Sequence, residues 1–341
     1  MDYISGRLLT EKGFIKGYIG LEGNELIEKG LGNPPNIPIM KGIITPSFFN
    51  MHTHIGDTFI RLRNIPLPHD LIRLVTPPDG LKHTLLKSTT KNEIVHGMKQ
   101  ALQEMKSSGI CCFCDFRENG TPGIKIIKEA LKECAMHSII LSRPKTLHYN
   151  TKEIDLLLKN SEGIAISSME EWNYEDLIEI VKRVKKQKKL FSLHVSERIR
   201  ENIDKVISLS PDFIIHMTKA TKLDLQIIKN NKIPIVICPR SNTFFQTFPP
   251  LKKMKEIGNM LLIGSDNGML HPPNLLDEIR HIMRMVPNLF STEELLDMMT
   301  YQSRKVLNSK DVIQAANLPT SYLVLDCNTL KPVYTSIYMR E

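Results

Sequence analysis

Short, wholly apolar segments alternate with helix-like patterns through most of this 341-residue chain, and this alternation constrains the fold more than any other feature. Apolar segments of this kind are typical of strands buried on both faces of a sheet, and most of the gaps carry apolar residues at helical spacing. Eight such segments follow one another, near residues 44, 111, 139, 165, 192, 214, 235 and 262. They predict an α/β fold, a (β/α)8 barrel. An open doubly wound sheet is the alternative, but no dinucleotide-binding glycine fingerprint follows the first strand.

The two ends of the chain differ from this middle part. Residues 1–44 contain short alternating strand patterns separated by turn signals such as TEKG and GNPPN. The tail, about Ser321–Arg340, returns to strand-like sequence. We therefore expect both ends to pair into one small β domain beside the barrel, with the chain divided into 1–44, 45–312 and 313–341.

Composition and charge exclude several classes of protein. Hydrophobic residues make up 41% and charged residues 24%, close to a globular average. No stretch approaches 18 apolar residues and the N-terminus lacks the apolar core of a secretory signal, so we expect a cytoplasmic protein without a membrane partner. The net charge is +8, and the basic residues are scattered apart from a lysine-rich run at Val181–Lys189. This run lies late in a helix pattern and is without aromatic residues. This favours a solvated helix end over nucleic-acid binding.

Titratable residues gather where the predicted strands end. His52 and His54 close the first strand two residues apart, so both rings point to one face and can bind one metal ion. Such a pair arises often by chance, but His194, His216 and Asp266 also end strands, the fifth, sixth and eighth. Three histidines and a carboxylate can hold a divalent metal with a position open for water, whose pKa the metal lowers. His216, if it is not a ligand, is placed to take or orient that water's proton.

Weaker candidates lie in the loops after these strands. Glu197 follows His194 by three residues, either as a first-turn helix carboxylate or as a proton shuttle beside the metal. Arg240 follows strand seven and either pairs with an anionic substrate group or stabilises its loop, and Asn242 faces the same rim. Four further residues have roles that the sequence leaves open: Asp57, Asp115, Trp172 and His271.

The sequence around these residues resembles the metal-dependent amidohydrolase superfamily. The matching motifs are PSFFNMHTHIGDT, LHVSE, DFIIHMT, CPRSN and IGSDN, in the family's order and approximate spacing from about residue 40 to residue 310. They are most similar to the branch that contains chlorohydrolases, cytosine and guanine deaminases and S-adenosylhomocysteine-type deaminases. The resemblance implies a distorted (β/α)8 TIM barrel with a small β domain formed by the N- and C-terminal segments.

The resemblance also implies roles for individual residues. The metal ligands would be His52, His54, His194 and Asp266. His216 and Asp266 would activate the water, and Glu197 would relay a proton to a ring nitrogen of the substrate. Hydroxide would then attack an amidine-like carbon, and a tetrahedral intermediate would expel ammonia.

The fourth strand departs from the binuclear branches of the superfamily. Its sequence, GIAISSMEE, lacks the lysine that dihydroorotases and hydantoinases carboxylate at this position. We therefore expect one divalent metal ion, with zinc first and iron or manganese as alternatives that accept the same donors.

The expected function is deamination of a small molecule, a purine- or pyrimidine-like heterocycle or nucleoside. One alternative is an amidohydrolase or chlorohydrolase that acts on another C–N or C–Cl bond at the same site. Another, from a different class, is a catalytically silent ligand-binding barrel. Whether the chain forms a homo-oligomer stays open.

Overall fold

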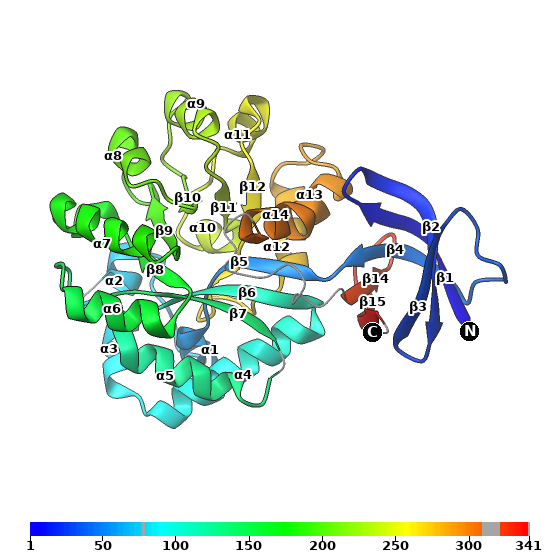
Figure 1. Cartoon of the computed structure of the whole chain (residues 1–341), viewed down its shortest axis with the longest axis horizontal. Coiled ribbons are helices and arrows are strands. Elements are labelled where there is room, and N and C mark those ends of the chain that lie inside the picture. The colour runs from blue at the N-terminus through cyan, green and yellow to red at the C-terminus, as the bar shows by residue number, and fades with distance from the viewer. Residues whose placement is uncertain (77–78, 135, 309–320, 340–341) are drawn as a thin grey trace.

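The computed structural model describes residues 1–76, 79–134, 136–308 and 321–339, and it contains two sheets (Figure 1). The smaller sheet closes into a barrel with the strand order β1-β2-β3-β15-β14-β4, and Ile19, Ile44 and Val324 are part of its core. This confirms the predicted small β domain built from both termini. Its strands are β1 (Asp2–Thr10), β2 (Gly13–Glu22), β3 (Glu25–Leu31), β4 (Met40–Pro46), β14 (Ser321–Leu325) and β15 (Pro332–Met339).

The larger sheet has nine strands within the described residues, in the order β12-β11-β10-β9-β8-β7-β6-β5-β13, and its neighbouring strands run parallel. β12 and β13 are the last two strands of this sheet along the chain, and together they correspond to the predicted eighth strand. They lie at opposite ends of the strand order in the sheet, so the sheet curls round. This confirms the distorted barrel. The strands are β5 (Phe48–His54), β6 (Ile110–Arg117), β7 (His137–Ser142), β8 (Gly163–Ile166), β9 (Leu190–Val195), β10 (Phe213–His216), β11 (Ile235–Ile237), β12 (Leu261–Ile263) and β13 (Asp266–Asn267).

The apolar run at the start of the barrel contains two strands rather than one. β4 ends at Pro46 and pairs with β1 and β14, whereas β5 begins at Phe48 and pairs with β6 and β13. The first barrel strand, which carries His52 and His54, is therefore β5, and its predicted position near residue 44 is wrong. An apolar run indicates burial, but the backbone partners that assign it to two sheets lie far away in the sequence. Because β4 continues past residue 44, the small sheet extends beyond the expected division, which itself stays a prediction.

Helices cover the outside of the larger sheet in Figure 1. Two of these helices are α4 (Lys91–Ser107) and α12 (Leu275–Met285). α13 (Thr292–Met299) and α14 (Tyr301–Asn308) are two helices rather than one, because the backbone of Thr300 leaves the helical region with φ −123° and ψ −94°. The remaining α-helices are α1 (Thr58–Leu62), α2 (Leu71–Val75), α3 (Leu81–Ser88), α5 (Gly120–Leu131), α6 (Thr151–Asn160), α7 (Tyr174–Lys186), α8 (Ile203–Ser208), α9 (Lys222–Asn230), α10 (Pro239–Phe244) and α11 (Leu251–Ile257).

None of the helices in the described part of the chain combines the length and the apolar character needed to cross a bilayer.

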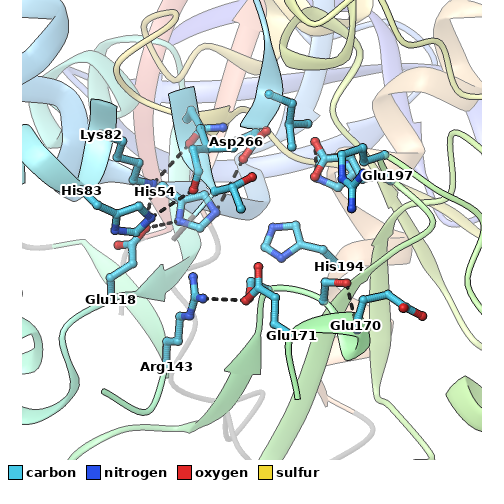
Figure 2. A pocket seen from close by; sticks show the side chains of 18 of the residues that line it. His54, Lys82, His83, Glu118, Arg143, Glu170, Glu171, His194, Glu197 and Asp266 are labelled. Carbon is cyan, nitrogen blue, oxygen red and sulfur yellow. Dashed lines mark hydrogen bonds and ion pairs between the residues drawn. The ribbon is translucent and has the colours of Figure 1, made fainter. Parts of the chain in front are cut away.

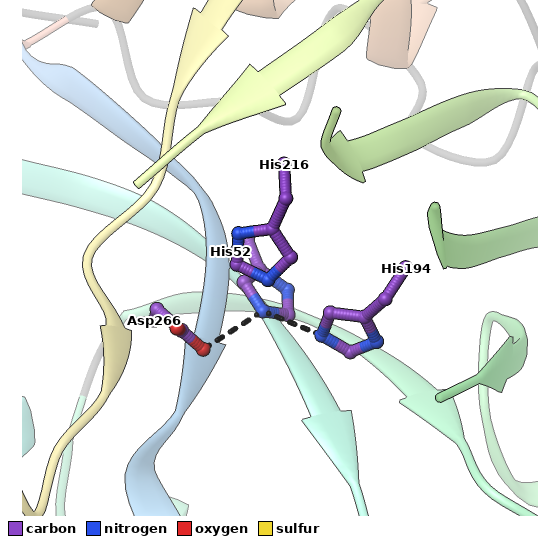
Figure 3. A group of neighbouring side chains, drawn as sticks. All are labelled: His52, His194, His216 and Asp266. Atoms are coloured by element: carbon purple, nitrogen blue, oxygen red, sulfur yellow. Dashed lines mark hydrogen bonds and ion pairs between the residues drawn. The ribbon is translucent and has the colours of Figure 1, made fainter. Parts of the chain in front are cut away.

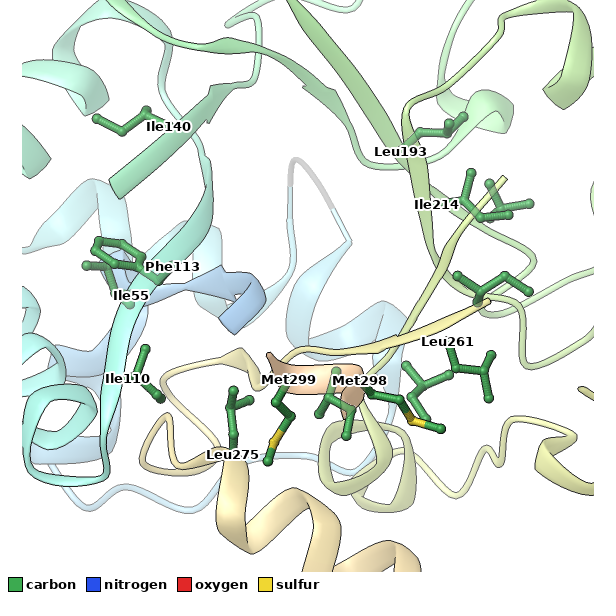
Figure 4. Close-up of a cluster of buried hydrophobic side chains, with 14 of the residues drawn as sticks. Ile55, Ile110, Phe113, Ile140, Leu193, Ile214, Leu261, Leu275, Met298 and Met299 are labelled. Atoms are coloured by element: carbon green, nitrogen blue, oxygen red, sulfur yellow. The ribbon is translucent and has the colours of Figure 1, made fainter. Parts of the chain in front are cut away.

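The main hydrophobic core lies between the larger sheet and its helices, and Figure 4 shows part of it. All of β9 is buried, as expected of a strand that is covered on both faces. Met298 and Met299 of α13 pack in this core together with Leu261 and Leu275. Close packing of this kind holds the strands in place, and so fixes the position of the side chains at their carboxyl ends.

Candidate active site

Four buried side chains converge at the carboxyl ends of the larger sheet's strands (Figure 3). His52 lies on β5, His194 lies on β9, His216 ends β10 and Asp266 begins β13. One nitrogen or oxygen atom of each side chain lies within 4.8 Å of the corresponding atoms of the other three. The parallel pairing of the strands brings these residues together, because the strands of such a barrel present their carboxyl ends on one rim.

The atoms of this group have the spacing of metal ligands. His52 Nε2 lies 3.2 Å from Asp266 Oδ1 and 3.2 Å from His194 Nε2. In a tetrahedral zinc site with bonds of about 2.0–2.1 Å, neighbouring ligand atoms are about 3.3 Å apart. His194 Nδ1 donates to the Ile166 carbonyl oxygen at 3.3 Å, which leaves the Nε2 lone pair facing the group. The donor set therefore fits a divalent metal ion.

Burial and neighbouring charges shift the pKa values of these groups. Burial lowers the pKa of His194 well below its usual value and that of His216 to about 4. Neutral imidazole is the form that binds metals. Burial opposes the ionisation of Asp266, but the hydrogen bond with His52 and the neighbouring histidines outweigh it and hold the Asp266 pKa well below its usual range.

The backbone is strained at two of these positions. His216 and Asp266 have positive φ angles of 76° and 58°. Non-glycine residues pay about 1–3 kcal/mol for such conformations, which cluster at functional sites. The connection from β12 to β13 also passes very close to His52, since a Cβ atom at Gly264 would lie only 2.7 Å from His52 Cβ. Glycine is therefore required there to bring Asp266 into position.

His54 lies beside this group and contacts a carboxylate that the sequence analysis missed. Its Nε2 is 3.6 Å from Asp266 Oδ1, and its Nδ1 is 3.0 Å from Glu118 Oε1. A carboxylate at Nδ1 fixes the tautomer of the ring and turns Nε2 toward the site. The assignment of His54 as a metal ligand stays a prediction. Glu118 directly follows β6, so the strand-end rule that selected the histidines could also have found it.

A buried ion-pair network surrounds Glu118. Lys82 Nζ lies 2.7 Å from Glu118 Oε1 and 3.0 Å from Asp57 Oδ2, and the Lys82 side chain is only 4% exposed. Burial alone lowers the pKa of Lys82, but the two carboxylates outweigh it and raise the pKa above its usual value. Arg117 forms an ion pair with Glu118 and lies 3.3 Å from Asp115. Lys82 comes from α3, outside the barrel strands, and no sequence pattern pointed to it.

Three residues that the sequence left open take structural positions. Asp115 accepts the Ile55 backbone N–H at 2.8 Å and so holds the loop after β5. Trp172 is buried in the main core. Burial lowers the pKa of His271 to about 4, and His271 is not part of the described lining of the cavity around the four-residue group.

The four-residue group opens into a cavity of about 210 Å³, which we call the active-site cavity (Figure 2). Glu197 lines this cavity, and its Oε1 lies 3.4 Å from His216 Nε2. Burial, and then the charges of Asp266 and Glu201, raise the pKa of Glu197 well above its usual value. The surroundings in one cavity thus favour the charged form of Asp266 and the neutral form of Glu197, and opposite pKa shifts of two carboxyl groups are typical of acid–base catalysis.

Arg240 and Asn242 lie behind the cavity wall. The side-chain amide of Asn242 is 3.1 Å from His216 Nδ1 and fixes the rotation of that ring. The Arg240 backbone N–H donates to Glu278 Oε2 at 3.0 Å, and its guanidinium lies 3.5 Å from Glu278 Oε1. Neither residue belongs to the cavity lining as far as the structure describes it. Their assignment to substrate binding stays a prediction.

A fold and a site of this kind define a class of hydrolases, and the comparison with protein families agrees. The model of the amidohydrolase family matches residues 43–313, and the chain belongs to this family. It is accordingly an enzyme, a hydrolase that acts on C–N bonds other than peptide bonds.

Relatives and solved structures match along most of the chain. The chain is 35% identical to an uncharacterized protein of Methanocaldococcus jannaschii, over 90% of this chain and 82% of that protein. It is 28% identical to a putative aminohydrolase of Methanothermobacter thermautotrophicus, over 82% and 75%.

Two solved deaminases have a similar fold. Helicobacter pylori aminofutalosine deaminase in complex with methylthio-coformycin superposes with a TM-score of 0.69 at 16% identity, over 96% of this chain and 93% of that one. A Xanthomonas campestris adenosine deaminase with bound zinc superposes with a TM-score of 0.71 at 13% identity, over 99% and 94%.

Proposed function

We propose that this protein is a metal-dependent aminohydrolase, which displaces ammonia from a purine- or pyrimidine-like heterocycle or nucleoside. The observation that carries the proposal is that Glu197 and Asp266 line one cavity, with Glu197 Oε1 3.4 Å from His216 Nε2. The surroundings lower the pKa of Asp266 and raise that of Glu197. Deamination of an amidine carbon needs a base to activate water and an acid to protonate a ring nitrogen. Asp266 and Glu197 are suited to these two tasks in the states that their surroundings favour.

The proposed metal ligands are His52, His54, His194 and Asp266, which would hold one divalent ion, zinc first. Such an ion, when bound, supplies an activated water near neutral pH. His216 lies at the same cavity with its Nε2 toward Glu197, and it takes or orients the proton of that water.

A single ion is supported by the end of the fourth barrel strand. Ser167 and Ser168 follow β8 there and line the active-site cavity. The binuclear branches named above, dihydroorotases and hydantoinases, have a carboxylated lysine at this position.

We also propose a cytoplasmic location. All six cysteines are unpaired, which suits a reducing compartment.

Glu197→Gln tests the proposed acid. We expect the zinc-loaded variant to keep its metal content and to lose about 10²–10⁴-fold in kcat, because the amide cannot donate the same proton. Ammonia release from a panel of purine and pyrimidine bases and nucleosides is the activity measurement, and elemental analysis gives metal per chain. Glu170→Gln is the matched control, since Glu170 lines the same cavity, whereas it is Glu197 that lies 3.4 Å from His216 of the four-residue group.

The products separate the competing functions. Full activity in Glu197→Gln would contradict the role of Glu197. Release of chloride from chlorinated heterocycles, with no ammonia from amino compounds, would favour a chlorohydrolase. A protein that takes up no zinc and turns over none of these compounds would favour a silent ligand-binding barrel.

A further inference from the structure

A second cavity lies next to the active-site cavity and takes no part in the chemistry proposed above. It has a volume of about 600 Å³ and is enclosed by α3, α4, α5 and the loop after β7. Its apolar wall includes Leu86 of α3, Ile94 and Met98 of α4, and Ile126 of α5. We call it the side cavity.

The two cavities share one wall. His83, Glu118 and Arg143 line both of them. Figure 2 shows these three side chains together at one side of the active-site cavity, with the guanidinium of Arg143 reaching Glu171 at 2.9 Å. Glu118 lines the side cavity and also contacts His54, one of the proposed metal ligands. A single side chain therefore separates the side cavity from that proposed ligand.

Volume indicates that the substrate occupies more than the active-site cavity. Ligand sites in proteins typically have about 300–1,000 Å³, and the active-site cavity alone, about 210 Å³, is below this range. It has room for a heterocyclic ring. The side cavity supplies the missing space, and its apolar wall favours an apolar group there.

The charged residues of the side cavity indicate which chemical group the far end of this apolar part of the substrate carries. Lys87 and Lys145 are exposed residues of the side-cavity lining, whereas Arg143 at the shared wall is already paired with Glu171. The acidic group in the described lining, Glu118, is already paired with Arg117 and Lys82. An anion at the end of the group therefore meets a cationic rim.

We propose that the side cavity binds a second arm of the substrate, apolar along its length and anionic at its end, while the heterocycle lies in the active-site cavity. This rests on the proposed function, because it assumes that the reacting ring sits beside the four-residue group. Arg143 then lies where the arm passes from one cavity into the other.

Three sets of compounds test the arm. The first set is 9-methyladenine, 9-methylguanine and 1-methylcytosine, the second carries a pentyl chain in place of the methyl group, and the third a 5-carboxypentyl chain. We expect kcat/KM for ammonia release to rise at least tenfold from methyl to pentyl and again with the carboxylate, mainly through KM. Binding of the same compounds to metal-free protein, measured by calorimetry, should show the same order.

Variants locate the effect. Ile126→Trp fills the side cavity and should reduce the ratio of pentyl to methyl kcat/KM. The double variant Lys87→Glu with Lys145→Glu should abolish the gain from the carboxylate. Its control, Lys252→Glu with Lys253→Glu, makes the same charge change on exposed residues of α11 and should keep that gain.

The outcomes distinguish the two proposals. Equal kcat/KM and equal affinity for all three arms would overturn the side-cavity inference and leave the deaminase proposal standing. Absence of ammonia release with every compound would overturn the proposed function. The order of the affinities of the three sets of compounds for metal-free protein would then test the side-cavity inference without any measurement of activity.

Discussion

At the scale of single residues, burial and neighbouring charges together shift the pKa values of the two carboxyl groups in the site. Asp266 and Glu197 face the same cavity, yet the histidines around Asp266 favour its charged form, whereas burial and nearby negative charge favour the neutral form of Glu197. The sequence indicated that both residues follow strands, but their protonation depends on neighbours that only folding supplies.

Glu278 offers a test of burial by pH. It is completely buried on α12, and burial raises its pKa to about 8 in spite of the nearby Arg240. Because the folded pKa exceeds the ordinary value of 4.5, the contribution of Glu278 to stability is present below about pH 4.5 and is lost as the pH rises through 8. We expect the free energy of unfolding of the natural chain, relative to Glu278→Gln, to fall between pH 5 and pH 8.

Denaturant unfolding of both proteins at several pH values measures this difference. Glu256→Gln, on an exposed position of α11, is the control and should show little change with pH. A difference for Glu278→Gln that stays constant across this range would show that the carboxyl group ionises in the folded protein as it does in the unfolded chain.

At the scale of elements, the segment between β5 and β6 supports the proposed metal site. It contains α3, whose Lys82 joins Asp57 from the loop after β5 to Glu118 at the end of β6, and Lys82 Nζ also lies 3.4 Å from Asn267 Oδ1 of β13. One buried amine thus connects three segments that carry or flank the proposed metal ligands. The sequence analysis did not single out Lys82, because a lone lysine in a short helix has no pattern that marks it.

Lys82→Met removes this connection. We expect zinc affinity to fall about 10–100-fold, the usual effect of losing a group that orients a metal ligand. Competition with a chromophoric chelator measures the affinity, and circular dichroism checks the fold. Lys87→Met, an exposed position of the same helix, is the control. Equal zinc affinities of the natural chain and a folded Lys82→Met would contradict a positioning role for Lys82.

At the scale of the whole molecule, the proposed ligands join distant parts of the larger sheet. They lie on β5, β9 and β13, and the unfolded chain holds them far apart. A metal ion that binds only the folded state stabilises it by about 2.7 kcal/mol at a free concentration one hundred times its Kd.

We therefore expect chelation to lower the Tm by a few degrees and added zinc to restore it. Scanning calorimetry measures both steps. Magnesium at the same concentration is the control, since it prefers oxygen ligands and water, and Asp266→Asn should lose most of the response to zinc. A Tm that does not respond to zinc in the natural chain would contradict a metal site at these residues.

The closed small barrel also belongs to this scale. Its strands β14 and β15 follow all strands of the larger sheet in the sequence. β14 pairs with β4, and β15 pairs with β3. Strand propensity at both termini predicted that the ends would meet. It could not predict the strand order, because pairing partners are chosen by contacts across the whole chain.

The sequence by itself determined the repeating strand–helix pattern, most element positions and the strand ends that carry His52, His194, His216 and Asp266. These features depend on periodicity and on a rule that strand ends meet at one rim. Only the tertiary structure decided that the apolar run before His52 is divided between two sheets, and that Arg240 is held by Glu278. It alone placed Lys82 and Glu118 beside His54. The physical reason is that these pairings join residues far apart in the chain, so no local pattern contains them.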